Sequence, residues 1–409
     1  MNINKILPKL RDDLSFREYT ENGERFAIII DIKGYAGQPV SLPVSILTLF
    51  NLIDGKKTAE EFIAEVKQII GEEADYVIEH FINLIEFLDY YGYLDSDNFS
   101  EIKTDIDSYL SSPVRKPVCT ENSYPADKDA LAKYLDSIFS SVEADNIPGT
   151  ANSIIVPHID FRIGSKAHRC YAAGYHSIRN TNADLFVILG TSHQGNSDYF
   201  MLTKKDFETP LGCAETDRDI IDMLASGLSY DLTIDDMAHR HEHSIEFQVV
   251  LLQHYFRNRS FRILPVLVGS FHNFIHDKTM PGSDGRLSEF ISKLKGIIAE
   301  MGRKAVFIAS ADMAHIGRKF NDKFDAEIKF ESLRTEDSEL LNSLQYCRPE
   351  EFFSAVSNVK DKNKICGLSP AYSLLKITNP AKGEILGYDI WNEKETKSAV
   401  SFASLAFYD

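Results

Sequence analysis

The segment SIIVPHIDF, at residues 153–161, decides the fold of this chain. Its apolar, β-branched run stops at a proline and is followed at once by His158, which is how a strand buried in a parallel sheet usually ends. The same layout, an apolar run and then a histidine, precedes His193 and His315. Ligands bind beyond the carboxyl ends of the strands in open α/β sheets. Three strands that each deliver a histidine to that edge therefore predict a shared pocket.

The chain from residue 149 onward alternates between predicted strands and helices. Four predicted strands are short, apolar and β-branched, and two tail strands are more polar on alternate residues, as expected of edge positions. This order favours an α/β fold with a mostly parallel central sheet and flanking helices. The predicted strands lie at 153–157, 184–190, 261–268, 304–310, 384–391 and 398–408, and the helices at 165–178, 217–226, 244–256, 284–301 and 336–344.

Residues 1–98 are predicted to form a separate small domain. A strand at 26–32 is followed by a helix at 44–52, and Thr58 is placed to cap a second helix. A third helix, at 74–91, carries apolar residues at three- and four-residue steps.

This order of elements resembles the PqqD-like peptide-recognition domains, which are small winged-helix units. The resemblance implies a peptide ligand, and the alternative is a helical docking or dimerisation module without one. It rests on Leu52, Asp54, Gly55, Thr58, Glu61 and the run Gly92-Tyr93-Leu94.

Residues 99–148 are predicted to be a linker and a lead-in helix to the larger domain, residues 149–409. The linker is rich in Ser, Asp, Pro and Lys, has no clear period, and contains prolines that interrupt a helix. A helix is expected from residue 128 to 142, with its apolar side facing the larger domain.

The composition bounds the class of protein. The chain has 409 residues, of which 44% are hydrophobic and 26% charged, as in ordinary soluble globular proteins. Its net charge of −17 argues against broad surfaces for nucleic acid or anionic membrane, because both are polyanions. Five scattered cysteines without a CxxC pair indicate reduced thiols and a cytoplasmic location. We expect neither a signal peptide nor a membrane span.

His158 and His193, at two strand tips, are candidate metal ligands. Neutral imidazole is the commonest protein ligand for transition metals. The third candidate is Cys366, because Gly367 allows close backbone approach and a helix follows, whose N-terminus lowers a thiol pKa. The alternative for Cys366 is a small buried residue at a helix start.

Two further clusters are candidates for catalysis. In the run HRHEHSIE, at residues 239–246, His243 and Glu246 are three apart at a helix start, so they are expected to orient a ligand histidine or to bind substrate. The alternative is an adventitious metal site. Asp312, three residues before His315, is expected to hold the imidazole tautomer as in a general acid–base pair. The alternative is a helix cap beside a bystander histidine.

Seven motifs in order resemble the Memo-like family, known as protein B of the bacterial AmmeMemoRadiSam (AMMECR1–Memo–radical SAM) system. The match spans residues 151–409. Such proteins are similar in fold to class III extradiol dioxygenases, which implies a non-haem metal pocket and, as partners, radical SAM and AMMECR1-like proteins. The motifs are PH at 157–158, LGTSH at 189–193, TPLG at 209–212, EHSIE at 242–246, LPVLVG at 264–269, SAD with His315 at 310–315, and ICG at 365–367.

The resemblance assigns roles residue by residue. His158, His193 and Cys366 match the metal positions, where iron or copper has been proposed. Asp312 and His315 match other pocket residues, and the EHSIE segment supplies His243 and Glu246. Three motifs depart from the family pattern: PHAGY is PHIDF at 157–161, SHH is SHQ at 192–194, and CGRHP is CGLSP at 366–370. The polar groups that face substrate in relatives are therefore partly absent.

The sequence leaves three functions open. The first is a metal-dependent oxidoreductase of the dioxygenase type, holding iron, or else copper or zinc, with His315 moving protons and His243 orienting an unknown small molecule or peptide. The second is a non-catalytic metal- or peptide-binding partner of a radical SAM/AMMECR1-type system. The third is a thiol hydrolase that uses Cys366 with His315.

Overall fold

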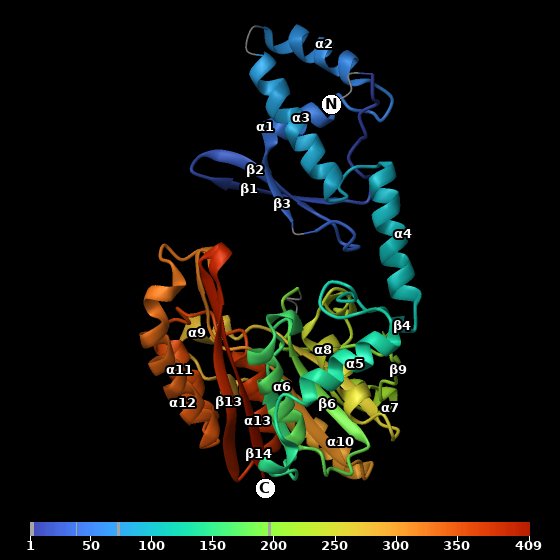
Figure 1. Ribbon diagram of the computed structural model, residues 1–409. Coiled ribbons are helices and arrows are strands. Elements are labelled where there is room, and N and C mark those ends of the chain that lie inside the picture. Colours follow the sequence, from blue (N-terminus) through green and yellow to red (C-terminus); the bar gives the residue numbers. More distant parts are fainter. Residues whose placement is uncertain (1–3, 38, 72–73, 195–197) are drawn as a thin grey trace. The chain divides into compact units, whose positions relative to one another are not determined.

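The computed structural model describes residues 4–37, 39–71, 74–194 and 198–409. The chain divides into two compact units, Met1–Ser111 and Ser112–Asp409, which we call the first unit and the larger unit (Figure 1). In the described residues, no helix has the length and apolar character needed to cross a bilayer.

The first unit packs helices on a small antiparallel sheet of order β1-β2-β3. Thr58 caps α2 as expected, and its reciprocal bonds with Glu61 form a capping box. Strand β1 escaped the sequence analysis because most of its side chains are exposed and polar. The winged-helix assignment stays a prediction. The elements are β1 (Ser15–Glu21), β2 (Glu24–Ile30), β3 (Val40–Pro43), α1 (Val44–Phe50), α2 (Ala59–Ile70), α3 (Ala74–Tyr90) and α4 (Asp97–Ser111).

Helix α4 occupies the beginning of the segment in which we expected a linker. Its sequence pattern is weak, since Ile106 is its one buried residue. Contacts with distant residues support it: the guanidinium of Arg11 lies 4.0 Å from the Phe99 ring centroid, and Gly92 lies against Ile102. Tertiary contacts of this kind are invisible to a search for periodicity.

The central sheet of the larger unit has the order β12-β14-β5-β11-β6-β10-β7, and β13 pairs with β14. Strands β5, β11, β6 and β10 are mutually parallel, as predicted, and antiparallel strands extend both ends. The sheet is thus mixed with a parallel centre. Its strands are β5 (Ser153–Val156), β6 (Leu185–Thr191), β7 (Phe200–Leu202), β10 (Arg262–Val268), β11 (Ala305–Ser310), β12 (His315–Gly317), β13 (Lys382–Glu393) and β14 (Ser398–Tyr408).

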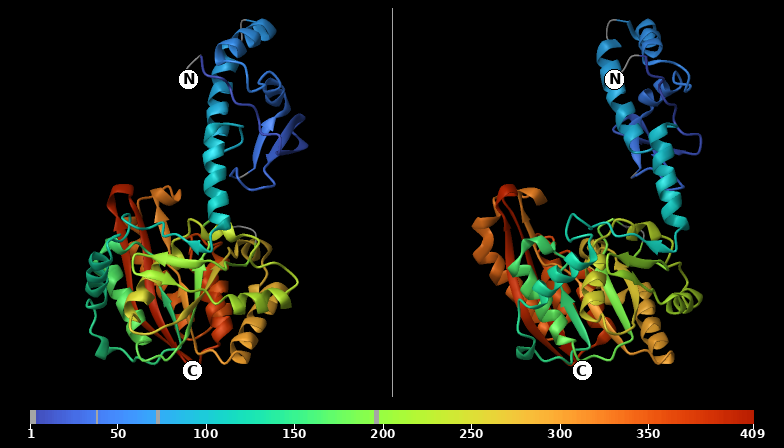
Figure 2. Two further views of the ribbon diagram at one scale, coloured as in Figure 1. Left: turned by 90° about the vertical axis from the view of Figure 1, so that its right-hand side faces the viewer. Right: turned by 45° about the vertical axis from the view of Figure 1, so that its right-hand side comes forward.

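Helices cover both faces of this sheet (Figure 2). Alternate residues of β6 enter two cores: Val187 and Leu189 pack with α7, α10 and α13, whereas Phe186 and Ile188 pack with α6 and α8. The flanking helices are α5 (Lys128–Phe139), α6 (Ser165–Ser177), α7 (Arg218–Gly227), α8 (Ser244–Tyr255), α9 (His272–Asp277), α10 (Gly285–Glu300), α11 (Phe330–Gln345), α12 (Pro349–Asn358) and α13 (Leu368–Thr378).

The expectation that both tail strands lie at an edge is wrong for β14. This strand pairs on both sides, with β13 and β5, and nearly all of it is buried. Before Tyr408 its polar residues are serines at every third position, 398, 401 and 404, which are small enough to be buried. The hydroxyl of Ser401 accepts the N–H of Ala314.

The first residues of the larger unit pair with its β8–β9 hairpin. Strand β4 (Val114–Arg115) pairs with β8 (Asp206–Thr209), which pairs in turn with β9 (Gly212–Ala214). The fully buried guanidinium of Arg115 forms an ion pair with Glu246. Residues that we expected to be a linker are therefore anchored by a buried ion pair.

Candidate metal centre

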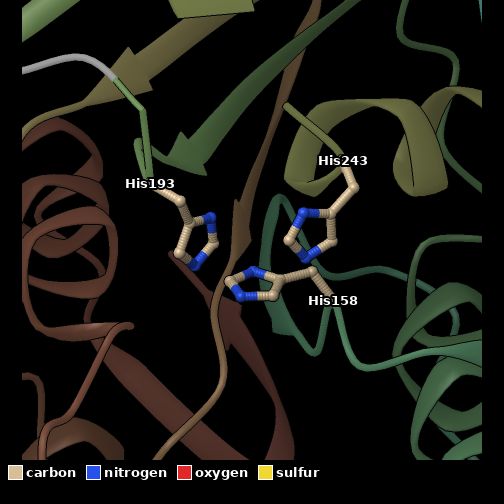
Figure 3. Close-up of side chains that lie close together, drawn as sticks. All are labelled: His158, His193 and His243. Carbon is tan, nitrogen blue, oxygen red and sulfur yellow. The ribbon is translucent and has the colours of Figure 1, made fainter. Parts of the chain in front are cut away.

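Three imidazoles meet at the carboxyl edge of the sheet (Figure 3). His158 follows β5, His193 follows β6, and His243 immediately precedes α8. Their ring centroids lie 5.2 Å (His158–His193), 5.3 Å (His158–His243) and 5.0 Å (His193–His243) apart. One ring nitrogen of each lies within 4.8 Å of the others.

Helix α8 reaches the tip of β6 because Gly190 has no side chain. A Cβ at this position would lie 2.7 Å from both Ile245 and Ser244, closer than real Cβ contacts come. The hydroxyl of Ser244 donates to the carbonyl of Thr191 at 2.8 Å. Ser244 therefore joins the helix to the strand tip and does not cap the helix. This approach brings His243 beside His193.

A buried polar network links the remaining strand tips to the same helix. The side-chain Nε2 of Gln248 donates to the carbonyl of Pro157 and to the hydroxyl of Ser310, both at 2.8 Å. The Ser310 hydroxyl donates to the carbonyl of Ser244 at 2.6 Å. The positions of β5, β11 and α8 are thus fixed relative to one another, and this fixes the relative positions of the histidines that they carry.

The hydrogen bonds of His158 define its tautomer. Its Nδ1 lies 3.0 Å from the carbonyl of Ser310, which can only accept, so Nδ1 carries the proton and Nε2 keeps its lone pair. Burial, together with the nearby His193 and His243, holds the pKa of His158 well below its usual range. This imidazole is therefore neutral, which is the form that binds metals.

Glu242 orients the other two histidines. Its carboxylate lies 3.1 Å from Nδ1 of His193 and 3.2 Å from Nδ1 of His243. Burial alone raises the pKa of Glu242, but hydrogen bonds from His193 and His243 hold it below its usual range. Burial lowers the pKa of His193, and Glu242 more than offsets this, so that it is raised. Carboxylates that accept from the outer nitrogen of a ligand histidine are typical of metal sites.

Cys366 and Asp312 form a second potential ligand group with His158. The Sγ of Cys366 lies 3.4 Å from Nε2 of His158, and a carboxylate oxygen of Asp312 lies 3.7 Å from the same nitrogen. Gly367 permits the approach: its N–H donates to the Asp312 carbonyl at 2.9 Å, and a Cβ there would lie 2.5 Å from that oxygen. Burial raises the pKa of Cys366 well above its usual range and that of Asp312 to about 7.

The centre is buried on one side and open on the other. The side chain of His158 is 3% exposed, whereas those of His193 and His243 are 33% and 37% exposed. A cavity of about 220 Å³ adjoins the centre and has His193 and Cys366 in its wall. A small molecule can therefore reach the histidines from this side.

The predicted ligand set of His158, His193 and Cys366 is divided between the two groups, which share His158. His243, predicted to orient substrate, lies among the ligand-type residues. Glu242 is the first residue of the EHSIE motif, but the sequence predicted no role for it. Its position one residue before His243 could have indicated that it orients a ligand histidine.

The predicted pairing of Asp312 with His315 is wrong. Asp312 accepts the backbone N–H of His158 at 3.0 Å. The Nδ1 of His315 lies 3.2 Å and 3.1 Å from the carbonyls of Met313 and Lys364, and burial lowers the pKa of this imidazole to about 4. A spacing of three residues places side chains together only in a helix, and residues 311–314 are not helical.

Two further expectations for residues 239–246 are corrected. Glu246 does not face the histidines, because its carboxylate pairs with Arg115 and accepts the backbone N–H groups of Val118 and Cys119. His239 belongs to neither potential ligand group, and its Nε2 lies 2.9 Å from the carbonyl of Met201. The three neighbouring histidines of this run therefore do not form one adventitious site.

The donor set fits a transition-metal ion. It offers three imidazoles whose outer nitrogens are engaged by a carbonyl or a carboxylate, with a thiol and a carboxyl group beside them. Imidazole and thiol ligands suit iron, copper and zinc, whereas magnesium and calcium prefer oxygen.

Comparison with known proteins gives the family. A protein of Aquifex aeolicus described as a MEMO1 family protein is 27% identical over 405 residues, 98% of this chain and 100% of its own length. MEMO1 family proteins of Nitrosopumilus maritimus (25% over 307 residues, 72% and 99%) and Methanococcoides burtonii (30% over 205 residues, 49% and 68%) are also similar. The profile described as Memo-like protein matches residues 115–406, which include every residue of the candidate centre. The chain belongs to the Memo-like protein family.

Proposed function

We propose that this protein is a metal-dependent enzyme, an oxidoreductase of the non-haem dioxygenase type that uses iron, with copper or zinc as the alternative ions. The observation that carries the proposal is the convergence of His158, His193 and His243 with their outer nitrogens already engaged. The likeness in fold to class III extradiol dioxygenases, implied by the sequence motifs, belongs to the same proposal.

In this proposal the three imidazoles hold the ion, and Cys366 remains the further ligand expected from the sequence. The chemistry that such an ion supplies when bound is Lewis-acid activation and, for iron or copper, electron transfer. Glu242 keeps His193 and His243 in the tautomer that presents Nε2 to the centre. The negative charge of Glu242 also stabilises the positive charge that a bound ion adds at these imidazoles.

In this proposal Asp312, and not His315, transfers protons. The Asp312 carboxyl lies 3.7 Å from Nε2 of His158, at the centre itself. His315 is engaged through Nδ1 by two carbonyls, which fixes its ring but gives it no carboxylate partner of the kind a catalytic histidine uses.

The thiol hydrolase expected as a third function receives no support from the contacts of Cys366. Its sulfur lies against His158 and the carbonyl of Asp312, and its raised pKa disfavours the thiolate that such a reaction needs.

Metal analysis of the full-length protein purified without oxygen tests the proposal. Wild type is expected to hold about one equivalent of iron, copper or zinc, and His158→Ala/His193→Ala less than a tenth of that. His80→Ala/His276→Ala removes two exposed histidines as a matched control and is expected to retain the metal. Equal metal content in all three proteins would remove the proposal.

We also propose that the first unit recruits a partner, in the way expected of a radical SAM/AMMECR1-type system. The supporting observation is a set of exposed aromatic side chains on or just after α3. Tyr76 and Tyr90 are 69% and 73% exposed, and at the end of the helix the ring of Tyr91 contacts those of Phe87 and Tyr90. Phe87→Ser/Tyr90→Ser is expected to reduce co-purification of co-expressed radical SAM and AMMECR1-like proteins. Unchanged co-purification would exclude this surface.

A further inference from the structure

Two cavities near the candidate metal centre share part of their walls. The inner cavity, of about 220 Å³, has His193 and Cys366 in its wall. The outer cavity is larger, about 900 Å³. Both are lined by His272, Asp361 and Lys364, so the two spaces adjoin along these three side chains.

Part of the wall of the inner cavity is apolar. Val268, Phe271, Ile365 and Leu368 line it, with the hydroxyls of Thr191, Ser192, Ser270 and Ser369 among them. An apolar lining with a few polar groups favours a compact carbon skeleton and disfavours a free ion.

The outer cavity is basic in a strongly acidic protein. Lys278, Lys360 and Lys364 line it with His272 and His276, and among its described lining residues Asp361 is the one carboxylate. The chain as a whole carries a net charge of −17. A local excess of positive charge against that background attracts anions selectively.

The three shared side chains are already held in place. Nε2 of His272 lies 3.0 Å from the buried carboxylate of Asp361, which also accepts the backbone N–H of Ile365 at 2.8 Å. The Nζ of Lys364 donates to Asp322 at 2.8 Å. Neither Lys278 nor Lys360 forms an ion pair with any residue that the structure describes, so their charges are available to a ligand.

We propose that the outer cavity is an anion-binding subsite for a small molecule whose apolar skeleton occupies the inner cavity and whose carboxylate or phosphate end is bound by Lys278 and Lys360. The inference rests on the proposed metal site only for the other end of this molecule, which it directs toward His193. The anionic end needs no metal, because its ligands are the two lysines.

Calorimetric titration of metal-free, full-length protein at low ionic strength tests the subsite. The probes are inorganic phosphate and succinate, and the tighter of the two identifies phosphate or carboxylate as the preferred group. Lys278→Gln/Lys360→Gln is expected to weaken binding of the preferred anion by about tenfold or more, as loss of charge-assisted hydrogen bonds does.

Two controls separate this proposal from others. Lys133→Gln/Lys295→Gln changes the net charge equally at exposed sites outside both cavities and is expected to bind as wild type. His158→Ala/His193→Ala is expected to lose metal yet keep anion binding, so failure of the metal proposal leaves this one standing. No binding of either anion by wild type, or equal binding by Lys278→Gln/Lys360→Gln, would overturn the subsite.

Discussion

The Nδ1 atom of His193 lies 3.1 Å from the carboxylate of Glu242, a residue forty-nine positions along the chain. The same carboxylate also accepts the backbone N–H of His193 at 2.8 Å. Glu242 thus fixes both the loop after β6 and the ring that the loop carries. This double contact makes Glu242 the main determinant of how the exposed side of the centre is arranged.

Substitution of Glu242 by glutamine is expected to weaken metal binding by about 10- to 100-fold, because an amide stabilises the imidazole–metal unit less than a carboxylate does. Competition titration with a metal-binding dye measures this. Near-ultraviolet circular dichroism of the metal-free variant controls for folding, since Glu242 also accepts backbone N–H groups of His243 and Ser244. A folded variant with wild-type affinity would contradict the orienting role.

Cys366→Ser is expected to keep one metal per chain but to change the selectivity. Loss of the thiol removes a soft ligand, so affinity for Cu(I) is expected to fall more than affinity for Fe(II). Parallel titrations under anaerobic conditions compare the two ions. If both affinities fell as far as they do in His158→Ala, Cys366 would rank with the histidines as a principal ligand.

Arg115→Met is expected to destabilise the larger unit by about 3–5 kcal/mol, because it leaves the buried carboxylate of Glu246 without its cation. Denaturant unfolding of the single variants and of Arg115→Met/Glu246→Leu measures the coupling. The double variant is expected to lose less stability than the sum of the singles. Additive losses would show that the ion pair between Arg115 and Glu246 does not anchor the segment around β4.

A pH-dependent effect is expected at Asp337, whose carboxylate accepts the hydroxyl of Tyr388 at 2.7 Å. Burial, opposed by hydrogen bonds from Ser401 and Tyr388, raises the pKa of Asp337 from 3.8 to about 6. Between pH 3.8 and about pH 6 the folded state therefore binds more protons than the unfolded state. The contribution of Asp337 to stability is lost as the pH rises from about 4 to 6.

Asp337→Asn removes this loss. It is expected to stabilise the protein above pH 6 by at most about 3 kcal/mol, and to have little effect near pH 4. Thermal unfolding across that range checks the sign, with the exposed Asp129→Asn as a control. Stabilisation that is the same at both pH values would contradict the raised pKa.

The sequence predicted the parallel centre of the sheet, because a buried strand is marked by its own apolar run. It also predicted three residues of the two potential ligand groups: His158 and His193, which directly follow such runs, and Cys366, which precedes a glycine and a helix. His243 was placed in a supporting role because it lies at a helix start. Its approach to the sheet depends on Gly190, which belongs to another segment.

The remaining differences have the same physical origin. Spacing of three residues suggested pairs within Asp312–His315 and His243–Glu246, but Asp312 faces His158 and Glu246 faces Arg115. Both partners are more than a hundred residues away in sequence. Local periodicity holds no information on contacts between residues so far apart in sequence.

The measurement that tests the central claim most directly is a crystal structure of protein purified without oxygen, with anomalous diffraction recorded at the iron, copper and zinc edges. We predict one anomalous peak among the Nε2 atoms of His158, His193 and His243, at the edge of the resident metal. A metal-loaded crystal whose anomalous peak lies elsewhere, with these three imidazoles bound to no ion, would contradict the account.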